Sequence, residues 1–365
     1  MAINLQWTDE DWARIERDWS AWWAGELDRP IVVIEGIDAS RRLPEAPSFV
    51  SSLGMNMPAE EVIDRYQAHL EARRFYGDAF PRWWPNFGPG IMAGFLGARV
   101  NPVPDTVWFE PAARVDIRDL HPTYDPDNPW WQRVRELTRL AVERWGRQVA
   151  VAHTDLGGNL DILASLRTTE QLLLDLYDAP EEVERLVGEI TRLWLRYYDE
   201  LYEIVRVAGR GTNPWAAIWS PGRCYMLQSD FCYMLSPRMF ERFVLPDLAA
   251  CCEALDHGFY HLDGKGQIVH LDMLLSLERL RGIQWVPGDG APPPEEWLWL
   301  LKRIRDGGKL CQLAVTPEGA RTIVRELGGR GFAFHIGYLM DRDEAEDLLR
   351  VLAAEDAGRR GGRPV

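Results

Sequence analysis

The stretch Gly258-Phe-Tyr-His-Leu-Asp-Gly264 predicts a short β-strand from which two polar side chains project together. Residues two apart in a strand point to the same face, so His261 and Asp263 share a face that Tyr260 and Leu262 do not. The glycine that follows ends the strand and lets a ligand or another backbone approach. An imidazole and a carboxylate placed together can hold a metal ion or move a proton. The structural alternative is a buried histidine hydrogen-bonded to a loop-capping aspartate, because His-x-Asp is a short motif.

Outward from this stretch, short apolar segments alternate with segments of helical periodicity. We predict eight strands, at 29–35, within 81–100, and at 148–153, 214–219, 260–263, 282–286, 309–313 and 331–336. The helical segments between them are 57–76, 129–146, a long one from 178, 236–255, 267–277, 294–305 and 316–327, with 342–353 at the end. This alternation is typical of a (β/α)₈ barrel. A doubly wound open sheet is the alternative, but no G-x-G-x-x-G turn follows an early strand.

The fold prediction is therefore an α/β protein with one (β/α)₈ TIM barrel. The barrel is expected to cover residues 29–355, after an N-terminal Trp-rich helical extension at 1–28 and before a flexible tail at 356–365. A chain of 365 residues is long for one domain, but α/β barrels reach this size. Residues 110–127 are expected to form a loop-rich insertion.

Composition and charge exclude several classes of function. The net charge is −15, and no basic stripe interleaved with aromatic residues is present, so we expect no nucleic-acid partner. The five cysteines show no CxxC spacing, which suits a reducing cytoplasm. Neither a signal peptide nor an 18-residue apolar run is found, so we expect a cytoplasmic protein without a membrane partner. A homo-oligomer is compatible with this composition.

The predicted strand ends gather the candidate site residues, because active sites of barrels lie at the carboxyl ends of the strands. Three of the seven histidines, His153, His261 and His335, end separate predicted strands. Besides His261 and Asp263, the side chains expected at these ends are Glu35, His153, Asp155, Trp219, Trp285, Gln312, His335 and Tyr338.

Seventeen tryptophans are far more than a chain of this length usually carries. Five of them fall in the first 23 residues at helical spacing, which favours packing of an amphipathic helix on the body. Trp219 and Trp285 end two predicted strands, and Trp83, Trp84 and Trp108 fall in predicted loops. Their indoles are expected to form an aromatic wall against a methylated, sugar-like or ring-shaped substrate. Packing alone is the alternative for the tryptophans.

Three segments of the chain resemble the uroporphyrinogen decarboxylase superfamily, which includes the corrinoid and coenzyme M methyltransferases. They are Gln228-Ser-Asp-Phe-Cys-Tyr-Met-Leu-Ser-Pro-Arg-Met-Phe-Glu-Arg-Phe-Val-Leu-Pro246, the His261-x-Asp-Gly264 strand end, and Gly331-Phe-Ala-Phe-His-Ile-Gly-Tyr338. The resemblance covers most of the chain from residue 29 and implies a (β/α)₈ barrel. It also implies that Asp230 faces the substrate, although a turn cap is the simpler role for this residue.

Departures from the superfamily pattern direct the functional prediction. Uroporphyrinogen decarboxylases carry arginines after the first strand, where this chain has Glu35 and Asp38, so it does not resemble an authentic uroporphyrinogen decarboxylase. Zinc methyltransferases of the superfamily carry His-x-Cys and a later Cys. Here Asp263 and Tyr338 take the two cysteine positions. Nitrogen and oxygen ligands still suit zinc but also admit other divalent metals, and the loss of thiolates argues against a thiol such as coenzyme M as acceptor.

Two enzymatic interpretations follow, with a third that is not catalytic. In the first, His261 and Asp263 bind a divalent metal, with zinc the first choice, and a methyl group moves between a small methylated substrate and a corrinoid carried by a partner protein. Asp230, His335 and Tyr338 are the candidate catalytic residues. The second is a metal-free decarboxylase or lyase that acts on a small carboxylated or sugar-like substrate by His/Asp acid–base catalysis. The third is a barrel that binds sugars or ammonium groups with its tryptophans.

Overall fold

The computed structural model describes residues 3–38 and 40–361. Its strands are β1 (Ile31–Ile37), β2 (Arg73–Gly77), β3 (Arg82–Trp83), β4 (Arg99–Val103), β5 (Thr106–Glu110), β6 (Ala150–Val151), β7 (Cys224–Leu227), β8 (His257–Asp263), β9 (Leu280–Val286), β10 (Leu310–Val315) and β11 (Phe332–Leu339). Strands and helices alternate over the C-terminal half of the chain, as the sequence predicts.

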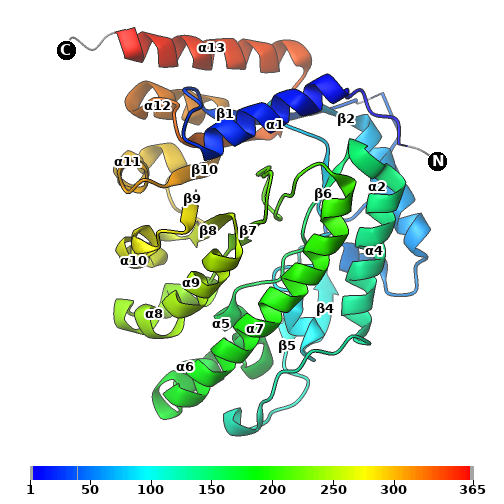
Figure 1. Cartoon of the computed structure of the whole chain (residues 1–365), viewed down its shortest axis with the longest axis vertical. Coiled ribbons are helices and arrows are strands. Elements are labelled where there is room, and N and C mark those ends of the chain that lie inside the picture. The colour runs from blue at the N-terminus through cyan, green and yellow to red at the C-terminus, as the bar shows by residue number, and fades with distance from the viewer. Residues whose placement is uncertain (1–2, 39, 362–365) are drawn as a thin grey trace.

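The helices surround these strands (Figure 1). They are α1 (Asp9–Trp23), α2 (Ala59–Ala72), α3 (Met92–Phe95), α4 (Pro129–Trp145), α5 (Asn159–Arg167), α6 (Thr169–Asp178), α7 (Pro180–Val205), α8 (Pro237–Phe243), α9 (Leu245–Ala254), α10 (Leu271–Ser276), α11 (Leu298–Asp306), α12 (Pro317–Leu327) and α13 (Arg342–Gly361). Helices α10, α11 and α12 follow one another along one side of the strands, whereas α2, α4 and α7 pack together on the other.

The main sheet has seven strands in the order β2-β1-β11-β10-β9-β8-β7. Strand β2 is antiparallel to β1, and all the other pairs are parallel. Strands β3 and β6 form a separate parallel pair, and β4 and β5 form an antiparallel hairpin. The predicted α/β class with a parallel sheet is confirmed. Strand pairing within residues 3–38 and 40–361 does not join the two parallel sheets, so the closed barrel stays a prediction.

The strands of the main sheet bury side chains on both faces, as parallel strands do. One face, which includes Tyr260 and Leu262 of β8, packs in the large cluster that the surrounding helices share. On the other face, Val33, Met226 and Phe259 pack with the tryptophans of α1. Polar residues follow on this second face toward the carboxyl ends of the strands, and they form the candidate site described below.

Helix α1 closes the amino ends of the strands. It begins with a capping box, in which the Thr8 hydroxyl accepts from the Asp11 N–H and the Asp11 carboxylate accepts from the Thr8 N–H. Trp12, Trp19, Trp22 and Trp23 are buried, and three of their indoles donate hydrogen bonds to the backbone of the body. The Trp22 indole reaches the Phe332 carbonyl, 3.1 Å away at the first residue of β11. The predicted packing of the N-terminal helix on the body is therefore confirmed.

Two predicted elements differ from the structure, and one observed strand is not among the predicted ones. Residues 214–219 are not a strand, since Pro214 lacks a donor and the carbonyls of Pro214 and Trp215 accept hydrogen bonds from the Arg82 guanidinium. The strand that stands before β8 in the main sheet is instead β7, which the sequence pattern does not predict. The single helix predicted over 236–255 is two helices, because Pro246 falls at its middle.

The C-terminus also differs from the prediction of a flexible tail from residue 356. Helix α13 continues to Gly361, and the buried Asp356 carboxylate accepts a hydrogen bond of 2.8 Å from the Gly329 N–H. This bond fixes the helix against the loop before β11. Residues 362–365 lie outside the described residues.

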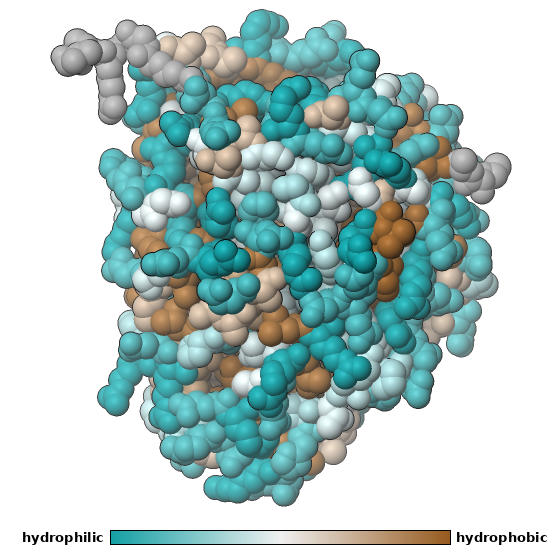
Figure 2. Space-filling view, viewed as in Figure 1, coloured by the Kyte–Doolittle hydropathy of each residue, from teal (hydrophilic) through white to brown (hydrophobic). Residues whose placement is uncertain are grey.

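The face of the molecule shown in Figure 2 is mainly hydrophilic, with small hydrophobic patches between the charged side chains. In the described part of the chain, no helix combines the length and the apolar character that crossing a membrane requires.

Candidate metal site

Asp230, His261 and Asp263 form the group of side chains best suited to hold a metal ion. Each offers one ligand atom, and these atoms all lie within 4.8 Å of one another. His261 and Asp263 project from the end of β8, with Nε2 3.9 Å from Oδ2. Asp230 follows β7, the neighbouring strand. The structure thus brings together the two predicted metal ligands and the acid predicted to be catalytic.

The donor set fits a divalent ion. Ligand atoms about 2.0–2.2 Å from a zinc ion in tetrahedral geometry lie about 3–4 Å from one another, so small side-chain rotations would close this site. One imidazole and two carboxylates are ligands that zinc, manganese and cobalt accept. All five cysteines are buried and free, and no cysteine belongs to a potential ligand group in the described residues.

The His261 ring is held in one orientation by Gln284 of the neighbouring strand β9, which in turn bonds to Gln312 of β10. His261, Gln284 and Gln312 are partners across β8, β9 and β10. The Nδ1–H of His261 donates to Gln284 Oε1, and Gln284 Nε2 donates to Gln312 Oε1 over 2.6 Å. Burial lowers the pKa of His261, so the ring is neutral. This arrangement leaves the Nε2 lone pair directed toward Asp263 and available to a metal.

Asp161, which the sequence analysis missed, supports Asp230 from the first turn of α5. Its carboxylate accepts hydrogen bonds from the backbone N–H groups of Asp230, at 3.0 Å, and of Phe231, at 2.7 Å. Burial and the Asp230 charge raise the pKa of Asp161. Burial and the Asp263 charge likewise raise the pKa of Asp230. A bound cation would relieve this repulsion among carboxylates.

Asp155 adds a fourth carboxyl group beside these acids. Burial raises its pKa to about 8, and the charges of Asp230 and Asp161 act in the same direction. Its Oδ1 accepts a hydrogen bond of 2.9 Å from the Gly157 N–H. At neutral pH this carboxyl group keeps its proton, so it can donate a hydrogen bond or a proton beside the candidate metal ligands.

The turn between Asp155 and Asp161 requires glycine for close approach. A Cβ atom on Gly158 would lie 2.1 Å from the Gln228 carbonyl oxygen and 2.5 Å from Asp161 Oδ2. This close approach lets the first turn of α5 lie against the segment that carries Asp230.

The structure does not place Trp219 and Trp285 in the aromatic wall that the sequence predicts. Trp219 packs with the tryptophans of α1 and donates to the Arg210 carbonyl. Trp285 is next to Gln284 in the strand, so it points to the opposite face, where it contacts Trp297. The indole that contacts His261 is that of Trp215, edge-on with ring centroids 5.2 Å apart, and Trp84 lies beside Trp215.

His153 also lies away from the triad formed by Asp230, His261 and Asp263. It is buried, stacks on Tyr198 of α7 with ring centroids 4.7 Å apart, and has no hydrogen-bond partner at either ring nitrogen within the described residues. Burial lowers its pKa to about 4. The structure places the His153 ring against Tyr198 of α7, and its predicted contact with a substrate stays a prediction.

Among the remaining predicted residues, Gln312 accepts a hydrogen bond from Gln284. Tyr338 is exposed, next to the place where the register between β1 and β11 shifts. His335 lies near Arg73 and Arg82, whose charges, together with burial, lower its pKa to about 4. Glu35 pairs with Arg73 of β2. The sequence showed no arginine after the first strand, but the fold brings one to Glu35 from the next strand.

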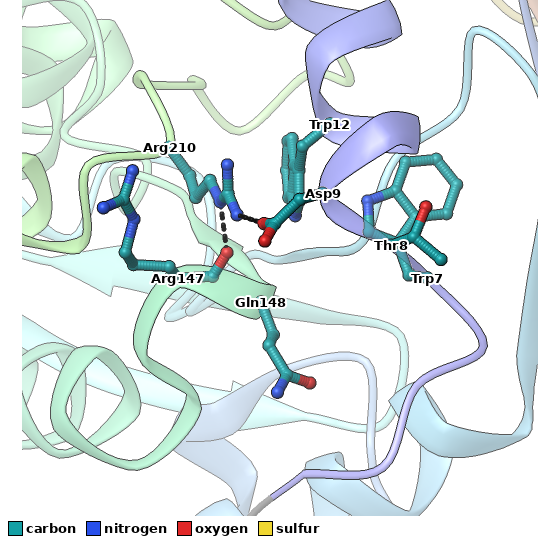
Figure 3. A pocket seen from close by; sticks show the side chains of 7 residues that line it. All are labelled: Trp7, Thr8, Asp9, Trp12, Arg147, Gln148 and Arg210. Carbon is teal, nitrogen blue, oxygen red and sulfur yellow. Dashed lines mark hydrogen bonds and ion pairs between the residues drawn. The ribbon is translucent and has the colours of Figure 1, made fainter.

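Two cavities lie at opposite ends of the strands. One of about 660 Å³ reaches Asp161 and Asp230 and is walled by the β4–β5 hairpin, α5 and the first turn of α6. The other, of about 620 Å³, lies where β6 begins, between α1 and Arg147 (Figure 3). There the Arg210 guanidinium already pairs with Asp9 and lies against the Trp12 ring. Of these two cavities, the first reaches the triad, at Asp230, and a third cavity of about 530 Å³ reaches it at Asp263.

Comparison with known proteins bears on the fold. No protein-family model matches the chain, and no curated protein matches its sequence. Among solved structures it is similar to a methyltransferase from Methanosarcina mazei, with a TM-score of 0.61 and 13% sequence identity. The match covers 94% of this chain and 98% of the other. The two proteins therefore share a fold over nearly their whole lengths.

Proposed function

We propose that this protein is a metal-dependent methyltransferase that moves a methyl group between a small methylated substrate and a corrinoid or similar acceptor. The observation that carries the proposal is the triad of Asp230, His261 and Asp263, with ligand atoms within 4.8 Å of one another beside a cavity. Two further points support it. The fold is shared with a protein named a methyltransferase, and the sequence resembles a superfamily that contains corrinoid methyltransferases.

In this proposal the triad holds a divalent ion, zinc being the first choice. When bound, the ion would act as a Lewis acid toward the heteroatom that carries the methyl group. Gln284 keeps His261 in the ligand tautomer, and Asp161 keeps the backbone of Asp230 in place. Asp155, which is protonated at neutral pH, supplies a proton to the heteroatom as the methyl group leaves. Trp215 bounds the space beside His261.

The proposal is tested by methylation of free cobalamin reduced to its Co(I) form. Zinc-loaded protein is mixed with this acceptor and a panel of methoxylated aromatic compounds, methylamines and methyl thioethers, and the Co(I) absorbance is followed. We expect methylcobalamin to form with at least one compound. The His261→Ala variant should be inactive, whereas exchange of the exposed His121 for Ala should have no effect. Equal rates with and without His261 would contradict the proposal.

A metal-free decarboxylase or lyase is the second candidate, and the raised pKa of Asp155 favours it. A carboxyl group that stays protonated near pH 7 can act as a general acid without a metal. In that case a small carboxylated substrate should release CO₂ in the presence of a chelator, at a rate that depends on Asp155. Strict dependence on added metal would exclude this alternative.

A further inference from the structure

The guanidinium of Arg82, a half-buried residue of β3, has no acidic partner within the described residues. Its Nε donates to Asn213 Oδ1 over 3.1 Å, and Nη2 donates to the carbonyls of Pro214, at 3.2 Å, and Trp215, at 2.8 Å. In the described part of the chain, Nη1 makes no hydrogen bond, and no carboxylate pairs with Arg82. A fixed guanidinium with a free donor is unusual, because a desolvated charge is costly unless it is paired.

The charge that acts on Arg82 is that of another arginine, Arg73, and not that of an acid. Burial and the charge of Arg73 both lower its pKa, to about 10, so the group remains charged at neutral pH. Arg73 forms an ion pair with Glu35. Burial and the charges of both arginines lower the pKa of His335, whose ring makes no hydrogen bond within residues 3–38 and 40–361. In a chain of net charge −15, this cationic group (Arg73 and Arg82, with the neutral His335 ring beside them) is a local exception.

Trp215 connects the cationic group to the triad. Its carbonyl accepts the Arg82 hydrogen bond, while its ring contacts His261 edge-on. Trp84 follows Arg82 by two residues, so its side chain lies on the same face of this extended segment as that of Arg82. The Trp84 ring lies beside that of Trp215. A ligand that reached from Arg82 to His261 would therefore lie along the Trp215 side chain. The carboxylates of Asp230 and Asp263 would be at one end of it and the guanidinium at the other.

We propose that Arg82, with Arg73 and His335, binds a carboxylate group of the substrate and so selects small carboxylic acids whose far end lies at the triad. The role of the far end rests on the function proposed above, whereas binding of the carboxylate does not. A carboxylate matches the planar guanidinium and accepts charge-assisted hydrogen bonds from Nη1 and from the neutral His335 ring. It would supply the anion that the fold itself does not provide.

The test is calorimetric titration with matched pairs of probes that differ only in charge. Acetate, methoxyacetate and benzoate are compared with acetamide, methoxyacetamide and benzamide, and inorganic phosphate is titrated separately. We expect at least one carboxylate to bind about ten-fold more tightly than its amide. Arg82→Met should remove this preference, and Arg82→Lys should retain part of it. Arg74→Met removes the same charge from β2, where Arg74 pairs with Asp38, and should leave binding unchanged.

The outcomes separate this proposal from the proposed function. Asp263→Asn should weaken metal binding but keep the preference for carboxylates, because Asp263 is not part of the cationic group. Circular dichroism melting establishes that the Arg82 variants are folded. If Arg82→Met is unfolded, loss of part of the preference in Arg82→Lys carries the test. Binding of every carboxylate no tighter than its amide, or tighter binding of phosphate than of all carboxylates, would overturn the proposal.

Discussion

The properties of His261 as a ligand depend on Gln284, a residue that would not itself touch the metal. Exchange of Gln284 for Leu removes the acceptor of the Nδ1–H, so the ring can rotate and take the other tautomer. We expect the affinity for zinc to fall about 10- to 100-fold. A competition titration against a chromophoric chelator measures the change.

The Gln284→Glu variant is the matched control. A carboxylate at this position still accepts from Nδ1, so this variant should bind zinc at least as tightly as the wild type. Wild-type affinity in the Gln284→Leu variant would show that His261 is oriented by other contacts, or that it is not a ligand.

His153 makes a prediction about stability as a function of pH. Its pKa is about 4 in the folded protein, below the unfolded value of about 6.5, so the unfolded chain binds the proton more readily. The stability that the neutral ring contributes is therefore present above pH 6.5 and lost as the pH falls toward 4. Between pH 7.5 and pH 5 this loss is about 2 kcal/mol.

Exchange of His153 for Phe isolates this effect. Phenylalanine can keep the stacking on Tyr198 and removes two buried ring nitrogens that have no partner in the described residues. The unfolding free energy of the variant relative to wild type, from urea titrations at both pH values, should rise by about 2 kcal/mol on acidification. An unchanged difference would mean that the ring titrates normally in the folded protein.

For single residues, the sequence could predict those features of the site that depend only on near neighbours along the chain. The shared face of His261 and Asp263 follows from strand geometry alone, and the structure has them there. Gln284, Asp161 and Trp215 could not be found in this way. Their contacts depend on the register between β8 and β9 and on a turn in which glycine allows close approach. Trp285 was misplaced because a position at a strand end does not say which face a side chain takes.

Among the elements, α1 makes a contribution to stability that can be tested through Trp22. Trp22 is 1% exposed, contacts Trp19 and Trp23 edge-on, and donates to the first residue of β11. We expect Trp22→Ala to lower the unfolding free energy by about 3–5 kcal/mol. Chemical denaturation followed by circular dichroism measures it.

Trp108 provides the matched control, since it is 61% exposed on β5. Exchange of Trp108 for Ala should change the unfolding free energy by no more than about 0.5 kcal/mol. If Trp22→Ala were equally mild, α1 would be an accessory element that the strands do not need.

Helical periodicity predicted the long elements well, and short strands were the source of error. Helix α4 begins at Pro129 as expected, and the amphipathic α7 begins at Pro180, two residues after its predicted start. The segment 214–219 resembles a strand in composition, but its carbonyls bond to Arg82 and not to a neighbouring strand. Such long-range competition for backbone groups cannot be seen in a local pattern.

For the whole molecule, we predict that uroporphyrinogen is not converted to coproporphyrinogen. The structure changes the reason for this prediction, because Glu35 and Asp38 are paired with Arg73 and Arg74 and do not repel a substrate by themselves. The obstacle is instead the carboxylate pair of Asp230 and Asp263, which an eight-carboxylate substrate would meet at the triad. Chromatography of the porphyrins after oxidation measures the product, and turnover at a rate useful to a cell would refute the prediction.

The alternation of strands and helices predicted the parallel α/β class, and with it the gathering of polar residues at the strand ends. Closure of the sheet into a barrel depends on pairing between short strands such as β3 and β6, which carry only two residues each. Their sequences contain too little periodicity to fix a partner. The fold shared with the methyltransferase from Methanosarcina mazei could likewise not be inferred from composition, since the two sequences are 13% identical.

The most direct test of the central claim, that Asp230, His261 and Asp263 hold a catalytic metal, is the metal content of the purified protein. Elemental analysis before and after dialysis against Zn²⁺, Mn²⁺ or Co²⁺ should give about one divalent ion per chain. The His261→Ala variant should give none, with its circular dichroism spectrum unchanged. A wild-type protein that carries no metal and takes up none of the three ions would contradict the account.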